Sequence, residues 1–256
     1  MVSIKEKIVF ITGASVGIGA ACARTFAREG SRLLLAARRV EKLRQLELEL
    51  KSLGAPAVHS IALDVRIWDA VSKAIDELPA EWRAIDILLN NAGLSRGLDT
   101  VFNADLQDWE EMIDTNIKGL LYVTRKVTPG MVERGAGHVI HIGSISGEEV
   151  YPGGNVYCAT KFAVRGLTKG MRIDFLGTGV RVSSVDPGLV NTEFGTVRFH
   201  GDKNRADTVY KGMTPLSGED VAETVLFVAT RPAHVNINFL NVMPTDQAGV
   251  SFIHRK

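Results

Sequence analysis

Seven short apolar runs alternate with longer amphipathic segments along the whole of this 256-residue chain. Runs of this length, bounded by glycine, asparagine or aspartate, are typical of strands in a parallel sheet that is covered on both faces. The runs are Ile8–Ile11, Leu33–Ala37, His59–Val65, Ile85–Leu89, His138–Ile142, Val180–Val185 and Phe239–Met243. This alternation predicts one α/β domain over residues 1–256, a doubly wound parallel sheet of about seven strands with helices on both faces.

The segments between the runs have helical periodicity. Apolar residues recur at three- and four-residue steps over Val40–Leu53, and again over Ala70–Leu78, as one buried helix face requires. A later helix is predicted to begin after Ser217, where Asp220 completes a variant of the capping box. Residues 188–216 have weak periodicity and many polar residues and glycines. They are predicted to form a loop or a small helical lid over a site.

Composition excludes several classes of partner. The formal net charge is +1, which argues against nucleic acid or an anionic membrane as the main partner. Cys22 and Cys158 are too few for a disulfide framework, and neither they nor the histidines have the spacing of a metal site. The apolar run near the N-terminus is too short for a signal peptide, and no later stretch approaches a membrane span. A cytoplasmic protein without a catalytic metal is therefore expected.

A glycine-rich turn follows the first predicted strand. Residues Thr12–Gly19 carry the pattern G-x-x-x-G-x-G and lead into a helical segment. Such a turn lets the backbone approach a pyrophosphate and directs a helix N-terminus at the anion. Glycines also mark strand–helix turns that hold no ligand, but the position after the first strand favours a dinucleotide site.

The second predicted strand ends in Arg38 and Arg39, where dinucleotide folds usually place a carboxylate for the adenosine ribose. A carboxylate would repel a 2′-phosphate, whereas arginines hold a phosphate through charge-assisted bidentate bonds. The alternative is a solvated surface at the start of a helix. The missing acid and the added arginines both favour NADP.

Tyr157 and Lys161 lie four residues apart in a predicted helix, so both side chains face one side of it. A neighbouring ammonium favours the phenolate and is expected to lower the tyrosine pKa. Ser144 follows a predicted strand at its carboxyl end, where ligands of open α/β sheets bind. A Tyr/Lys pair is usually a surface pair, but its combination with a strand-end serine and a dinucleotide turn favours catalysis.

Taken together, these features resemble the short-chain dehydrogenase/reductase family over nearly the whole chain, which implies a Rossmann fold. The matching blocks are Thr12–Gly19, Leu63–Val65, Asn90–Gly93, Asn116, Ser144, Tyr157 with Lys161, and Pro187-Gly188. The resemblance implies that Tyr157 is the general acid/base and that Ser144 polarises the substrate carbonyl. It also implies that Lys161 lowers the tyrosine pKa and binds the nicotinamide ribose, and that Asn116 holds a proton-relaying water.

The same resemblance implies the contacts of the cofactor, NADP. Asp64 and Val65 would contact adenine, Asn91–Gly93 the adenosine ribose, and Pro187–Val190 with Thr192 the nicotinamide end. The substrate would meet Ser144 and Tyr157. The full expected cofactor set is Gly13, Ser15, Gly17, Ile18, Gly19, Arg38, Arg39, Asp64, Val65, Asn91, Ala92, Gly93, Tyr157, Lys161, Pro187, Gly188, Val190 and Thr192.

A narrower likeness is to bacterial NADP-dependent 3-hydroxy acid dehydrogenases, which act on serine, allo-threonine and related acids. The segments that carry it include LPAEWRAIDILLNNAGLSRG and DPGLVNTEFGTVRFHGD, which extend beyond the general motifs. It implies reversible hydride transfer between NADP(H) and a small 3-hydroxy acid. The family likeness also implies a homotetramer built through the helices that contain Asn116 and Tyr157.

Two other functions remain open at this point. A 3-ketoacyl thioester or general carbonyl reductase would use the same four catalytic residues, and a non-catalytic NADP(H) sensor would need none of them. A substrate acid also needs a partner for its carboxylate beneath the lid. Arg198, or failing it the backbone amides near Thr192, is the candidate; the alternative is a solvated lid arginine.

Overall fold

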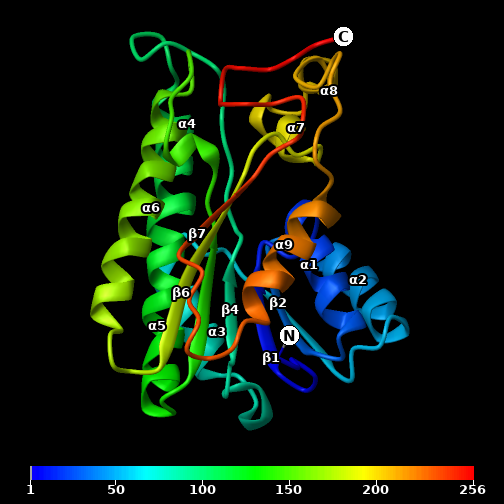
Figure 1. Ribbon diagram of the computed structural model, residues 1–256, viewed down its shortest axis with the longest axis vertical. Coiled ribbons are helices and arrows are strands. Elements are labelled where there is room, and N and C mark those ends of the chain that lie inside the picture. The colour runs from blue at the N-terminus through cyan, green and yellow to red at the C-terminus, as the bar shows by residue number, and fades with distance from the viewer. Residues whose placement is uncertain (1) are drawn as a thin grey trace.

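All seven apolar runs form strands in the computed structural model, which describes residues 2–256 (Figure 1). Over those residues the strands make one parallel sheet in the order β3-β2-β1-β4-β5-β6-β7. Their bounds are β1 Ile8–Thr12, β2 Arg32–Ala37, β3 Val58–Ala62, β4 Ile87–Asn90, β5 Gly137–Ile142, β6 Val180–Pro187 and β7 Phe239–Val242. The predicted doubly wound Rossmann fold is confirmed.

The helices predicted from periodicity over 40–53, over 70–78 and after Ser217 are present, and the structure adds others. Their bounds are α1 Gly17–Arg28, α2 Val40–Ser52, α3 Trp68–Asp76, α4 Leu106–Ile113, α5 Leu120–Glu133, α6 Asn155–Asp174, α7 Phe194–Arg198, α8 Lys203–Thr208 and α9 Gly218–Ala229, with the short turns η1 Ala80–Trp82, η2 Asp114–Gly119 and η3 Ile145–Gly147. None of these helices is both long and apolar enough to cross a bilayer, as far as residues 2–256 are concerned.

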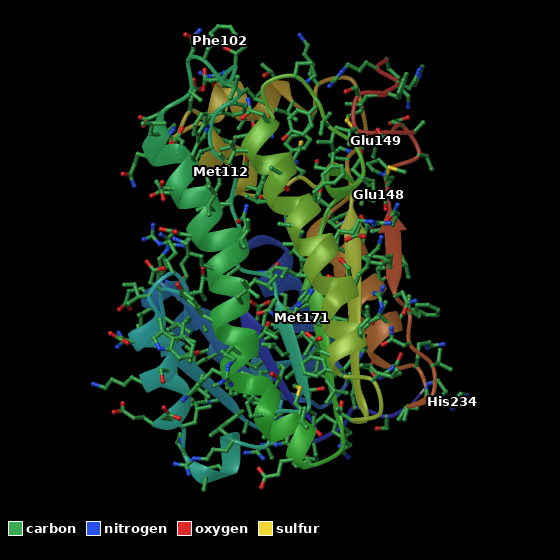
Figure 2. All side chains as sticks on the ribbon, turned by 90° about the vertical axis from the view of Figure 1, so that its left-hand side faces the viewer. Phe102, Met112, Glu148, Glu149, Met171 and His234 are labelled. Atoms are coloured by element: carbon green, nitrogen blue, oxygen red, sulfur yellow. The ribbon has the colours of Figure 1, made fainter. Side chains whose placement is uncertain are left out.

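Two hydrophobic cores lie on the two faces of the sheet, because successive side chains of a strand point to opposite faces. In β1, Val9 and Ile11 face the core beneath α1, α2 and α9, while Ile8 and Phe10 face the core beneath α3, α5 and α6. Figure 1 shows these two helical layers on either side of the strands. Figure 2 shows α5 and α6 running side by side over the second face, with Met171 on α6.

The predicted capping box begins α9. The Ser217 hydroxyl accepts a hydrogen bond from the Asp220 amide at 3.2 Å, and the Asp220 carboxylate accepts one from the Ser217 amide at 2.7 Å. Two otherwise unpaired helix amides are thereby satisfied. The helix then packs closely on α1, where a Cβ at Gly218 would lie 3.2 Å from the Ala21 methyl group.

Residues 188–216 contain two short helices, α7 and α8, above the carboxyl ends of the strands (Figure 1). An isolated parallel bridge between Val190 and Leu216 closes the base of this segment. The C-terminal tail is fastened to it, because the Lys256 amide donates to the Gly212 carbonyl at 2.7 Å. The segment therefore overhangs the edge of the sheet at which the strand order reverses between β1 and β4.

Candidate active site

A cavity of about 730 Å³ opens at the carboxyl edge of the sheet, where open α/β folds bind their ligands. Every residue of the expected cofactor set except Gly19 lines it, and so does Ser144. The sequence-predicted residues therefore gather at one place. Asn116 and Gly19 are not among the residues that line the cavity.

The glycine turn forms a backbone cradle along one side of this cavity. Gly13 and Gly17 adopt φ values of +64° and +56°, a region that favours glycine. A Cβ at Gly13 would lie 2.9 Å from the Ala92 Cα, so glycine is needed for the turn to approach the backbone that follows β4. The residues present therefore fit the phosphates of a dinucleotide.

Asn91 holds the glycine turn against the end of β4. Its side-chain amide donates to the carbonyls of Thr12 at 2.9 Å and Gly13 at 3.1 Å, while the Thr12 hydroxyl accepts from the Asn91 amide at 3.1 Å. Gly19 packs against the Asn91 side chain, because a Cβ on Gly19 would lie 2.5 Å from the side-chain amide nitrogen of Asn91. The absence of a side chain at Gly19 therefore lets α1 lie close to the Asn91 side chain, which is directed at the glycine turn.

The two arginines after β2 line the cavity beside the glycine turn. Arg38 and Arg39 are both exposed and both line the wall. Arg39 donates to the Ser15 hydroxyl at 3.3 Å and forms an ion pair with Glu193, a residue of the predicted lid, at 2.7 Å. Nearby, Asp64 is paired with Arg66 at 2.6 Å, and that contact holds the pKa of the Asp64 carboxyl below its usual range.

Tyr157 and Lys161 sit one turn apart on α6 and both line the cavity, as the spacing predicts. The Lys161 ammonium is buried and donates to the Ile142 carbonyl at 2.9 Å. Burial disfavours the charged form and lowers the pKa of Lys161 to about 8, although the buried Asp186 carboxylate acts in the opposite direction. Lys161 therefore titrates near the working range of an enzyme.

The pKa of Tyr157 is raised, which differs from the sequence expectation that Lys161 lowers it. Burial is the largest cause, followed by the neighbouring phenol of Tyr151, while Arg198 and Ser144 lower the pKa by less. Lys161 does not offset this burial, because its ammonium lies 5.9 Å from the Tyr157 ring centre and is directed at the Ile142 carbonyl. In this structure the protonated phenol is the stable form at neutral pH.

Asn116 lies in a π-helical turn, η2, between α4 and α5. Its side chain accepts from the Leu94 amide at 2.9 Å and donates to the Leu94 carbonyl at 2.8 Å and to the Thr160 hydroxyl at 3.0 Å. The Asn116 side chain lies close to Lys161. A hypothetical Cβ on Gly93 would be 3.3 Å from the Asn116 side-chain oxygen and 3.9 Å from the Lys161 ammonium nitrogen. Single π-helical turns occur often at functional sites.

Ser144 follows β5 and caps the short turn η3. Its hydroxyl accepts from the Ser146 amide at 3.0 Å, which fixes the side chain at the cavity wall. Glu148 and Glu149 follow this turn, beside the upper ends of β6 and β7 (Figure 2). Ser144 and Tyr157 thus face the same space from two different elements.

Several cavity residues had no sequence motif. Phe194 packs edge-on against the Tyr157 ring with the centres 5.7 Å apart, and Gln247 accepts from the Leu189 amide at 2.8 Å. Arg198, the candidate carboxylate partner, donates to the Tyr151 hydroxyl and to the Gly97 carbonyl. These residues come from residues 188–216 and from the tail after β7, where no local spacing signals a site. No group of metal-ligating side chains occurs among residues 2–256.

The fold and the cavity define a dinucleotide-binding oxidoreductase. A family model for short chain dehydrogenases matches residues 7–203, and the chain belongs to that family. It is 49% identical to an NADP-dependent 3-hydroxy acid dehydrogenase of Salmonella typhi over 97% of this chain and 99% of the relative. It is also 49% identical to sulfoacetaldehyde reductase 2 of Chromohalobacter salexigens, over 96% and 97% of the two chains.

Solved structures agree with these relatives. The closed form of a serine dehydrogenase complexed with NADP+ superimposes with a TM-score of 0.91 at 47% identity, over 97% of this chain and 100% of that chain. A serine dehydrogenase from Escherichia coli gives a TM-score of 0.82 at 45% identity, over 94% and 99%.

Proposed function

We propose that this protein is an NADP-dependent dehydrogenase that transfers a hydride reversibly between the cofactor and the hydroxyl-bearing carbon of a small 3-hydroxy acid. The observation that carries the proposal is the shared cavity: Tyr157 and Lys161 face the same space as the glycine turn and the paired arginines. Its nearly full-length relatives with such activities support the substrate class. A sensor that only binds NADP(H) would not need this arrangement.

We assign to the four candidate catalytic residues the roles that the family likeness implies. When bound, the nicotinamide of NADP(H) supplies or accepts the hydride. Tyr157, whose raised pKa keeps its proton at neutral pH, donates that proton to the carbonyl oxygen during reduction. Ser144 donates a hydrogen bond to the same oxygen. Lys161 binds the ribose, and Asn116 holds the water through which Lys161 regains its proton.

Arg198 is the proposed partner of the substrate carboxylate. Its guanidinium carbon lies 5.6 Å from the centre of the Tyr157 ring and 5.3 Å from that of Tyr151, so a cation faces the reacting end of the cavity. The Tyr151 hydroxyl and the Gly97 carbonyl hold it there. We propose that residues 188–216 act as the lid that brings this cation over the acid.

A short sulfonated aldehyde is the second candidate substrate. A sulfonate presents the same negative charge to Arg198 as a carboxylate, and one close relative is named as a sulfoacetaldehyde reductase. Arg198 would be the proposed partner of either anion. The preferred anion is the one that gives the higher kcat/KM.

A substrate screen tests the proposed function. NADP+ reduction is measured with serine, the threonine isomers, 3-hydroxyisobutyrate, 3-hydroxypropionate and 2-hydroxyethanesulfonate, beside uncharged secondary alcohols. The 3-hydroxy acids are expected to show the highest kcat/KM. Highest kcat/KM with the sulfonate would favour the second candidate, and equal values for uncharged alcohols would contradict both.

Replacing Arg38 with alanine is expected to weaken NADP+ binding by about tenfold, because one charge-assisted bond to the 2′-phosphate is lost. NAD+ has no such phosphate, and its binding should change little. Calorimetric titration of both cofactors measures the two affinities. Equal affinity of the unmodified protein for NADP+ and NAD+ would contradict the assignment.

The rate of reduction is expected to depend on the protonation of Lys161. Because kcat/KM for NADPH reports the free enzyme, it should be level below pH 8 and fall above it as Lys161, whose pKa is about 8, loses its proton. Asp186→Asn removes a carboxylate that raises this pKa, so the fall should begin at lower pH. Glu148→Gln removes the other carboxylate paired with Arg165 and should leave the profile in place.

We also propose a homotetramer in the cytoplasm. The family likeness supports assembly through the helices that carry Asn116 and Tyr157. Both cysteines are free and buried, which suits a compartment in which disulfides are rare. Light scattering of the purified protein measures the assembly: a mass of about four chains is expected, and a mass of one chain would contradict it.

A further inference from the structure

The Glu193 carboxylate bridges two cations at the start of α2. One oxygen lies 2.7 Å from Arg39 Nη1, and the other lies 2.7 Å from Lys42 Nζ. These contacts hold the pKa of Glu193 below its usual range, with Lys42 as the larger cause. Glu193 immediately precedes α7, whereas the two cations belong to a segment more than 150 residues earlier.

This bridge occupies the place expected for the 2′-phosphate of NADP. Arg39 lines the cavity and donates to Ser15 of the glycine turn, so it faces the adenosine end of the cofactor site. Lys42 lies three residues further on, on the same side of α2. Because both cations hold one carboxylate, an anion with two oxygens at the same position contacts both of them. A phosphate has such a pair of oxygens and more charge.

We propose that Lys42 binds the 2′-phosphate together with Arg38 and Arg39, and that Glu193 competes with that phosphate for Arg39 and Lys42. The proposal deepens the NADP dependence stated above and rests on it. Two anions repel each other at this spacing, so binding of the phosphate displaces the carboxylate. NAD+ brings only a hydroxyl to this place and leaves the bridge intact.

Displacement of Glu193 also acts on the lid. Glu193 is the N-cap residue of α7, and Arg198, the last residue of that helix, faces the Tyr157 ring. A helix of one turn transmits a shift at its first residue to its last. The 2′-phosphate therefore releases the segment that positions the candidate partner of the substrate acid, whereas a cofactor without that phosphate does not.

Fragments of the cofactor test the binding part of this proposal without any turnover. Adenosine 2′,5′-bisphosphate carries the 2′-phosphate, adenosine 5′-monophosphate lacks it, and neither has a nicotinamide. For exposed pairs of this kind we expect Glu193→Gln to tighten the bisphosphate by about two- to fivefold, and Lys42→Met to weaken it by a similar factor. The monophosphate should bind all variants alike, and the effects should shrink in high salt.

Two control variants make the same charge changes elsewhere on α2. Glu41→Gln removes a carboxylate that is paired with Arg44, and Lys51→Met removes an exposed ammonium at the other end of the helix. Both should leave the bisphosphate affinity nearly unchanged. Unchanged or weaker binding by Glu193→Gln, or unchanged binding by Lys42→Met, would overturn the proposal.

Amide hydrogen exchange tests the release of the lid. In the unmodified protein, the bisphosphate should speed exchange of the amides at residues 194–198, and the monophosphate should not. In Glu193→Gln these amides should exchange fast without any fragment. Unchanged or slower exchange with the bisphosphate would overturn the link to the lid. If the unmodified protein bound both fragments equally, NADP selectivity itself would fail, and this proposal with it.

Discussion

Tyr157→Phe is expected to lower turnover by about 100-fold or more, the usual scale for a positioned acid or base. The substitution keeps the ring, its edge-on contact with Phe194 and its place on α6, and removes only the hydroxyl that carries the proton. The raised pKa of Tyr157 means that this proton is present at neutral pH and available to the carbonyl oxygen during reduction. The measurement is kcat for NADPH oxidation with the keto acid.

The affinity for NADP+ should change little in this variant, because Lys161 and the glycine turn remain in place. Tyr122→Phe is the matched control: Tyr122 packs on Trp68 in the outer layer, does not line the cavity and should retain normal turnover. Near-normal turnover of Tyr157→Phe would refute the acid/base assignment, because another group would then have to supply the proton.

The fold was predictable because its signals are local. A buried parallel strand needs apolar residues on both faces, and β1 shows this with Val9 and Phe10 on opposite sides. The Ser217–Asp220 box and the glycine turn are also local, since each depends on residues a few positions apart. The four candidate catalytic residues could be named because family motifs mark them, and the roles given to them above are proposals.

The electrostatics of the site could not be predicted from spacing. The four-residue spacing on a helix places Lys161 near Tyr157. The protonation state of both groups depends instead on their burial and on the hydrogen bond from Lys161 to the Ile142 carbonyl. The same holds for Glu193, which contacts Arg39 only because the segment before α7 folds back over the start of α2. Such contacts join distant segments, and no periodicity within either segment signals them.

Arg198→Ala is expected to raise KM for serine by about 10- to 100-fold, because a charge-assisted hydrogen bond to a carboxylate contributes roughly 1.5–3 kcal/mol. An uncharged secondary alcohol has no carboxylate and does not use this contact, so its KM should stay nearly constant. The comparison is needed because Arg198 also donates to Tyr151 and Gly97, and those contacts support the lid. Steady-state kinetics with both substrates separates recognition from support.

Arg205→Ala is the matched control for the removal of a lid cation. Arg205 lies on α8 with its guanidinium 4.5 Å from the Phe199 ring centre, and it does not line the cavity, so both Michaelis constants should be unchanged. If Arg198→Ala raises the constants for serine and for the alcohol equally, Arg198 only supports the lid. The backbone amides near Thr192 would then be the remaining partner for the acid, because they border the same cavity.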